Sequence, residues 1–117
     1  MLQIINPAHG GVIAEIAEDT HASVIAKYRA ARAAQPAWAE TRLATRLAAI
    51  GRFREGVAAN LERLAAVLTS EVGKPIRQSR NELNGLLARI DFFLAQSEAT
   101  LAPRTVFDEG GMREVID

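Results

Sequence analysis

Few residues in this sequence could carry out acid–base or nucleophilic chemistry, and they are widely spaced. His9 lies in a turn rich in glycine and proline, where a histidine is typically solvated, and His21 lies at a predicted helix start. Two histidines in such different elements do not make a metal site by themselves. Four serines, none of which forms a pattern with a histidine base, complete the set: Ser23, Ser70, Ser79 and Ser97.

The strongest nucleophile of proteins is missing altogether. The sequence contains no cysteine, which excludes disulfides, thiolate catalysis and cysteine metal ligands within these 117 residues. Its carboxylates alternate with arginines at helix-surface spacing, which is typical of solvated faces. The pairs Gly10-Gly11 and Gly110-Gly111 are isolated and belong to neither a GxGxxG nor a Walker loop. From the residues alone we assign no catalytic, no cofactor-binding and no metal-binding residue.

Two features allow a binding role next to a structural one. Trp38 follows Pro36 on a predicted connection, where we expect a core anchor at a helix junction; stacking on a ligand is the alternative. A group of arginines with two glutamates between them lies on and beside the next helix: Arg42, Arg46, Arg52, Arg54, Glu40 and Glu55. Such a group could bind phosphate, but the interleaved acids favour a solvated helix face.

Bulk composition indicates a single globular unit. Apolar residues make up 49% of the chain, and 14 basic residues balance 14 acidic ones. Zero net charge gives no general attraction to nucleic acid or to an anionic membrane. The N-terminus does not resemble a signal peptide, and no apolar run approaches the roughly 18 residues of a membrane span. We therefore expect a cytoplasmic protein without nucleic-acid or membrane partners.

The elements that must position these residues are mostly helices. Residues 2–5 and 12–16 read as strands of a hairpin around the turn 6–11. A first helix starts at an Asp19 or Thr20 cap and ends before Pro36. Thr41 caps a second helix, and Asn60 caps a third that ends near Val72. A fourth helix runs from Pro75 to about Thr100. Residues 105–107 and 112–117 then read as two short strands around a turn at Gly110-Gly111, or as one kinked strand.

The second helix carries the clearest amphipathic stripe. Its apolar residues recur at spacings of three and four: Leu43, Leu47, Ile50, Phe53 and Val57. We expect Leu47, Ile50 and Phe53 to lie buried against Leu64, Leu68 and the stripe between residues 83 and 90. The adjacent rings of Phe92 and Phe93 cannot both face that core, so at least one needs another partner surface or stays exposed.

A corner at residues 71–76 joins the third and fourth helices. Gly73 can close a helix in the left-handed conformation without a Cβ penalty. Pro75 suits the first turn of the next helix, where its missing N–H would be unpaired in any case. Lys74, which precedes the proline, is pushed toward extended geometry. The sequence therefore predicts a helix stop and a helix start within six residues.

Three segments together resemble one family. Residues 5–13 read INPAHGGVI, residues 30–39 read AARAAQPAWA, and residues 71–76 read EVGKPI. With Arg46, they are similar in order and spacing to the start of NAD(P)-dependent aldehyde dehydrogenases, whose corresponding segments read INPATGEVI, AARAAFPAWA and EVGKP. The likeness covers almost the whole chain. His9 and Gly11 depart from the usual residues, but both lie in the turn.

The resemblance implies that residues 1–103 are the helical N-terminal part of a coenzyme-binding domain and residues 104–117 the start of oligomerisation strands. In the family, a cysteine thiolate attacks the aldehyde, and hydride then passes to NAD(P)+. A glutamate activates the water that releases the acid, and an asparagine helps to hold the oxyanion. All three residues follow Asp117 in family order. The fold expected is thus a mainly α fragment, inactive alone and binding no cofactor, whose full-length parent uses NAD(P)+ and an aldehyde. A homo-oligomer is expected.

Two alternatives stay open. Many members of the family hold a structural monovalent cation near the start of the fourth helix, and Glu82 is the corresponding carboxylate; a solvated glutamate is the favoured interpretation. The chain stops inside a strand pattern, which favours a fragment. A free-standing helical interaction module without enzyme activity is the second hypothesis for the function.

Overall fold

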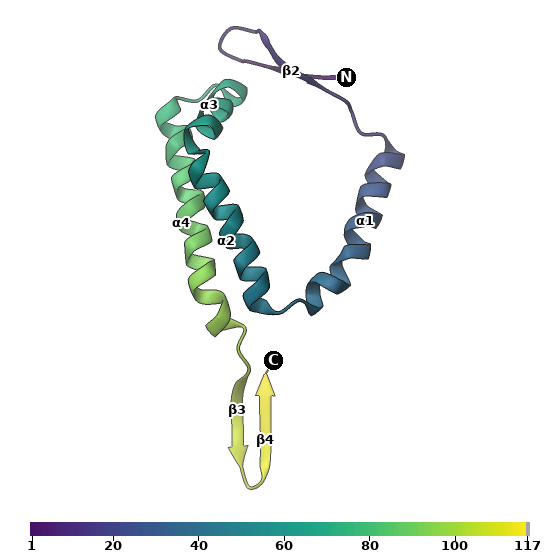
Figure 1. Ribbon diagram of the computed structural model, residues 1–117, viewed down its shortest axis with the longest axis vertical. Coiled ribbons are helices and arrows are strands. Elements are labelled where there is room, and N and C mark those ends of the chain that lie inside the picture. Colours follow the sequence, from purple (N-terminus) through teal and green to yellow (C-terminus); the bar gives the residue numbers. More distant parts are fainter. Residues whose placement is uncertain (117) are drawn as a thin grey trace.

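The computed structural model describes residues 1–116 of the chain and places two small β-hairpins before and after four helices (Figure 1). In chain order the elements are β1 (Leu2–Ile5), β2 (Val12–Ile16), α1 (His21–Glu40), α2 (Leu43–Ala59), α3 (Leu61–Val72), α4 (Ile76–Thr100), β3 (Arg104–Glu109) and β4 (Met112–Ile116). The expected mainly α chain with an N-terminal hairpin, four helices and C-terminal strands is confirmed.

The molecule is elongated. Its Cα radius of gyration is 21.2 Å and its principal extents are 73 × 39 × 20 Å, whereas a compact chain of this length has a radius of gyration of roughly 13–14 Å. Figure 1 shows the reason: α2, α3 and α4 form one packed body, α1 and the C-terminal hairpin extend away from it, and the N-terminal hairpin lies beyond the α3 end of the body. The interior of the molecule is therefore confined to the three-helix body.

In that body α2 and α4 run antiparallel. The short helix α3 packs against both of them at the end where α2 finishes and α4 begins (Figure 1). The buried apolar side chains come from all three helices: Val57, Ala65, Leu87 and Ile90. Ser79 on α4 is also fully buried, and its hydroxyl shares a hydrogen bond of 2.8 Å with the hydroxyl of Thr69 on α3. Small side chains and this paired polar contact let α3 approach α4 closely.

The corner between α3 and α4 forms as the sequence predicts. Gly73 ends α3 with φ at 76° in the left-handed region, and its N–H donates to the carbonyl of Thr69 at 2.9 Å. Pro75 is the N-cap residue of α4 with φ at −57°. Its carbonyl accepts from the N–H groups of Gln78 and Ser79, so the proline begins the new helix without losing a needed donor.

Both hairpins are two-stranded and antiparallel. Leu2 pairs with Ile16 in the first, and Arg104 pairs with Ile116 in the second. Gly110 and Gly111 make the second turn with φ values of 61° and 82°, the left-handed pair that a tight hairpin turn requires. Within residues 1–116 the two hairpins remain separate sheets, and nearly all their residues are exposed.

The predicted end of the first helix before Pro36 was wrong. α1 continues through Pro36 to Glu40. A proline inside a helix removes one hydrogen bond and strains the preceding turn, but residues 30–39 are mostly alanine, the residue with the best helix propensity. Pro36 also lies close to the helix end, so only about one turn of helix follows it.

This extension changes the caps around it. Thr41 does not cap the second helix but ends α1: its N–H donates to Trp38 and its hydroxyl to the carbonyl of Ala37. α2 begins after Arg42, without a side-chain cap. Asn60 stands at the predicted N-cap of α3, yet its side chain donates to Gly56 and so closes α2 instead.

The start of α1 follows the sequence prediction. Of the two candidate caps, Thr20 is the N-cap, and it exchanges two hydrogen bonds with Ser23 in a capping box. Asp19 supports the same turn by accepting from the Ser23 hydroxyl and from Lys27.

The predicted burial of the α2 stripe was only partly right. Leu47 is half-buried, but Ile50 is 42% exposed and Phe53 58% exposed. Val57 of the stripe is buried, and Arg54, outside the stripe, reaches Asp91 on α4. The apolar pattern marks a face wider than α4 can cover, so Phe53 falls outside the contact.

Candidate functional site

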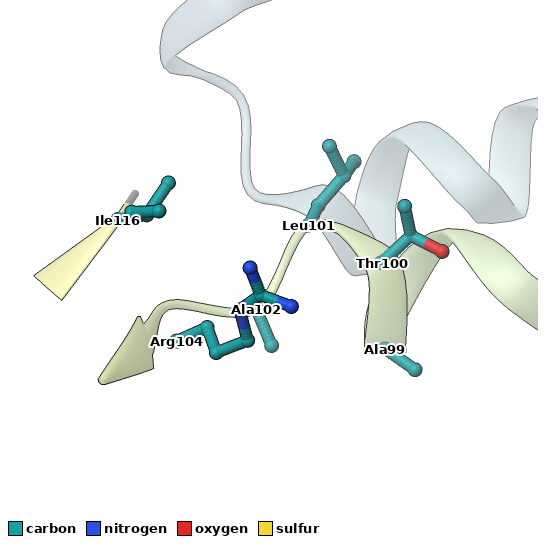
Figure 2. A pocket seen from close by; sticks show the side chains of 6 residues that line it. All are labelled: Ala99, Thr100, Leu101, Ala102, Arg104 and Ile116. Atoms are coloured by element: carbon teal, nitrogen blue, oxygen red, sulfur yellow. The ribbon is translucent and has the colours of Figure 1, made fainter. Parts of the chain in front are cut away.

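A hollow lies where α4 passes into β3. It has a volume of about 430 Å³ and is lined by residues from the end of α4, the connection and both C-terminal strands, as Figure 2 shows: Ala99, Thr100, Leu101, Ala102, Arg104 and Ile116. Its polar side chains are the Thr100 hydroxyl and the Arg104 guanidinium. They could bind an anion, but the lining holds no carboxylate, histidine or thiol that could act as base or nucleophile.

Two pairs of ionised side chains link the helices of the packed body. Arg54 holds Asp91 through two hydrogen bonds of 2.9 Å, which link α2 to α4. Arg80 of α4 contacts Glu62 of α3 through bonds of 2.8 to 3.1 Å. These guanidinium hydrogen bonds lower the pKa values of Asp91 and Glu62. A general acid needs a raised carboxyl pKa, so both pairs are structural links between helices.

Asp19 behaves in the same way. Hydrogen bonds from Lys27 and then from Ser23 lower the pKa of its carboxyl group. The contact ties the residue before the Thr20 cap to the second turn of α1. It stabilises a helix start and offers no proton donor near neutral pH.

The carboxylate of Glu82 is paired with a lysine side chain of the same chain. Lys74, at the corner before α4, forms a salt bridge with the Glu82 carboxylate. The Glu82 side chain is otherwise largely exposed. No group of three or more histidine or acidic side chains that could hold a metal ion occurs in residues 1–116.

The two histidines remain in separate elements. His9 lies in the β1–β2 turn, where its Nδ1 accepts the N–H of Gly11 at 3.1 Å. His21 begins α1. The structure thus assigns His9 a local role in the turn, which the sequence pattern did not reveal.

The arginines of α2 do not form one patch. Arg54 faces α4, Arg52 is exposed, and Arg42 precedes the helix. Arg46 is half-buried, and its Nε atom is enclosed without a hydrogen-bond partner among the described residues. The solvated-face interpretation is right for Arg52 but missed the tertiary contact of Arg54 and the enclosure of Arg46.

Large apolar side chains gather outside the core. On α1, Val24 and Tyr28 are exposed and Trp38 is 48% exposed, so the expected core anchor at a helix junction was wrong for this chain. On α4 both Phe92 and Phe93 are exposed, edge to face with centroids 5.5 Å apart. The anticipated exposed ring is therefore a pair of rings. Among residues 1–116, no helix is long and apolar enough to cross a membrane.

Comparison with known proteins gives a consistent result. The profile of the aldehyde dehydrogenase family matches residues 1–116. The chain is 31% identical over 116 residues to 3,6-anhydro-alpha-L-galactose dehydrogenase of Streptomyces coelicolor, a match that covers 97% of this chain and 24% of that protein. It is 36% identical over 100 residues to N-succinylglutamate 5-semialdehyde dehydrogenase of Chromobacterium violaceum, covering 86% and 20%.

A plant relative shows similar coverage. The mitochondrial acylating methylmalonate-semialdehyde dehydrogenase of Arabidopsis thaliana is 30% identical over 82 residues, which cover 70% of this chain and 14% of that protein. The chain thus spans a quarter or less of the curated relatives it matches. Their names mention different aldehydes, and their common feature is the dehydrogenase reaction.

Proposed function

The chain belongs to the aldehyde dehydrogenase family, and on that premise we propose that it is the N-terminal part of an enzyme that oxidises an aldehyde to a carboxylic acid with NAD(P)+. The observation that carries the proposal is the family match, which runs through residues 1–116. The proposal is supported by three relatives named as dehydrogenases, two of them of a semialdehyde.

The chemistry of this reaction requires groups that the 117 residues do not contain. A thiolate adds to the carbonyl carbon, hydride passes to the nicotinamide, and water then releases the acid and returns the thiol. The sequence has no cysteine, and the hollow between α4 and β3 offers only a hydroxyl and a guanidinium. We therefore assign the thiolate and the coenzyme contacts to the remainder of the parent protein, and no catalytic role to the present residues.

The role proposed for this chain is structural. Residues 1–103 would form the helical edge of the coenzyme-binding domain, and residues 104–117 would supply strands for assembly into a homo-oligomer. The exposed strands β3 and β4 and the exposed side chains of α1 and α4 support this role, since uncovered apolar surfaces and strand edges favour association. A cytoplasmic location remains part of the same proposal.

The test begins with the coding DNA beyond Asp117. We expect the reading frame to continue through a Trp-Asn segment and a later Gly-Gln-x-Cys segment. The protein from the whole frame should form reduced nicotinamide when given NAD(P)+ and an aldehyde. Replacing the cysteine of the Gly-Gln-x-Cys segment by alanine should abolish that signal, and the 117-residue chain alone should give none.

The aldehyde panel follows from the relatives. Semialdehydes that carry a carboxylate, and an anhydro sugar aldehyde, represent the compounds that their names mention. A frame that stops after Asp117, or a whole-frame protein that oxidises no aldehyde while correctly folded, would overturn the proposal. The first of these outcomes would favour the free-standing interaction module.

A further inference from the structure

The tip of the first hairpin meets the corner between α3 and α4, although the two turns are far apart in the sequence. Pro7 lies at the hairpin tip, and Gly73 lies at the corner. A Cβ atom placed on Gly73 would stand 2.6 Å from Cγ of Pro7, 3.6 Å from its Cβ and 3.9 Å from its Cδ. The proline ring therefore rests against the backbone at a point where any side chain would obstruct it.

The hairpin presents Pro7 on a well-braced turn. The N–H of Asn6 donates to Gly11 at 2.9 Å, and the N–H of Gly10 returns to Asn6 at 2.8 Å. The Asn6 side chain accepts from the N–H of Ala8 at 2.9 Å. Because the ring also fixes its own φ angle, Pro7 is a stiff projection that cannot easily move away from an obstacle.

The corner is braced as well. The N–H of Gly73 donates to Thr69, whose hydroxyl pairs with that of the fully buried Ser79. Lys74, the next residue, is tied to Glu82 on α4. The β1–β2 turn and the α3–α4 corner are thus both stiff, and they can touch only because Gly73 has no side chain.

We propose that the notch at Gly73 is a docking point for Pro7 and that this contact holds the N-terminal hairpin in place on the helical body. A two-stranded hairpin alone is marginally stable in water, and residues of β1 and β2 are almost all exposed. Docking at the corner links the order and position of the hairpin to the α3–α4 turn. Gly73 is then required for two separate reasons, its left-handed φ angle and its lack of a Cβ atom.

The two requirements can be separated by paired substitutions. Gly73→Ala introduces both backbone strain and a clash with Pro7. The double variant Gly73→Ala with Pro7→Ala keeps the strain but removes Cγ, leaving a Cβ to Cβ separation near the 3.6 Å of ordinary contact. Gly110→Ala is the matched control, because Gly110 also has a positive φ of 61° but has open space where the Cβ would lie.

The readout is the distance between hairpin and body. Because the chain has no cysteine, cysteines at Ala14 on β2 and Arg89 on α4 can carry two spin labels. The labelled chain is mixed with an excess of unlabelled chain, so that pulsed electron resonance gives the distance distribution within one chain even where copies associate. Circular dichroism of each variant checks that the helices remain folded.

We expect one narrow distance peak in the parent chain and in Gly110→Ala. Gly73→Ala should broaden and shift the peak while the helical signal persists, and the double variant should recover the parent peak. The docking proposal is refuted by a broad distribution in the parent, by an unchanged peak in Gly73→Ala, or by a double variant that stays as broad as Gly73→Ala. If Gly73→Ala unfolds, Pro7→Ala alone decides, because it removes the ring and leaves the backbone at Gly73 unchanged: a broadened peak supports docking, and an unchanged narrow peak refutes it.

Discussion

Truncation of Ile90 should destabilise the protein far more than truncation of Phe53. Ile90 is one of the four buried apolar residues within residues 1–116, with an exposed fraction of 9%. Replacing it by alanine removes the equivalent of three methylene groups, about 2.4 kcal/mol at ~0.8 kcal/mol each. The cavity left behind adds to this, so Ile90→Ala should lower the free energy of unfolding by roughly 3–5 kcal/mol.

The Phe53 ring is larger but contributes less. Full burial of a phenylalanine makes its truncation cost roughly 3–5 kcal/mol, but this residue is 58% exposed. Less than half of that effect should remain, about 1–2 kcal/mol. The stripe of α2 in the sequence predicts that Phe53 is buried too and that its truncation costs as much as a core residue, so the pair of variants compares the structure with the pattern directly.

Urea unfolding followed by circular dichroism measures both changes at several protein concentrations. An ordinary domain has only about 5–15 kcal/mol to lose, and a body with so few buried residues belongs at the lower end. Ile90→Ala should therefore be close to unfolding without denaturant, whereas Phe53→Ala should keep a clear transition. Equal losses, or a larger loss for Phe53→Ala at every concentration, would refute the assigned packing.

Three further outcomes follow from the same structure. Because Arg54 lowers the pKa of Asp91 below its ordinary 3.8, the stabilisation from this pair is complete above that value; the advantage of the parent over Arg54→Gln in unfolding experiments should shrink as the pH falls through the lowered pKa. Trp38 is the single tryptophan, so its fluorescence should be readily quenched by iodide; a protected, blue-shifted emission would contradict its exposure. Light scattering should give at least twice the 12.7 kDa chain mass, and deletion of residues 104–117 should shift the population to monomer; a monomeric parent at tens of micromolar would contradict association through the strands.

Local signals in the sequence were sufficient for most of the elements. The left-handed Gly73 and the helix-starting Pro75 set the corner through their own backbone preferences. Gly110 and Gly111 mark the second hairpin for the same reason. Such features depend on a few consecutive residues, so a single sequence is enough to place them.

The predicted helix end at Pro36 and the predicted burial of Phe53 were wrong because each depends on neighbouring residues, along the chain for Pro36 and across the fold for Phe53. Pro36 reads as a helix end by itself, but the alanines around it outweigh its penalty near the last turn. Phe53 reads as core because the apolar stripe gives no information about which partner covers it. The stripe correctly marked Val57, which faces α4 at the end where α3 also packs.

For the candidate sites, too, the sequence indicates some features, and others are visible only in the structure. The assignment of no catalytic or cofactor-binding residue remains a prediction, and the function rests on the family match and not on geometry. The contact of Pro7 with Gly73 left no signal in the sequence, because proline and glycine are common in any turn. The need for a residue without a Cβ atom at position 73 becomes visible only when the two turns are seen in contact in the structure.

The exposed face of α1 connects the fold to the proposed function. None of the residues of α1 is buried, although it carries Val24, Tyr28 and Trp38. Alanine favours its helical state, but a single helix of this length has marginal stability in water without a packed face. Relatives of which the chain covers a quarter or less have ample further structure with which to cover such a helix. Under the proposed function, the apolar residues of α1 are therefore half of an interface whose other half belongs to the remainder of the parent enzyme.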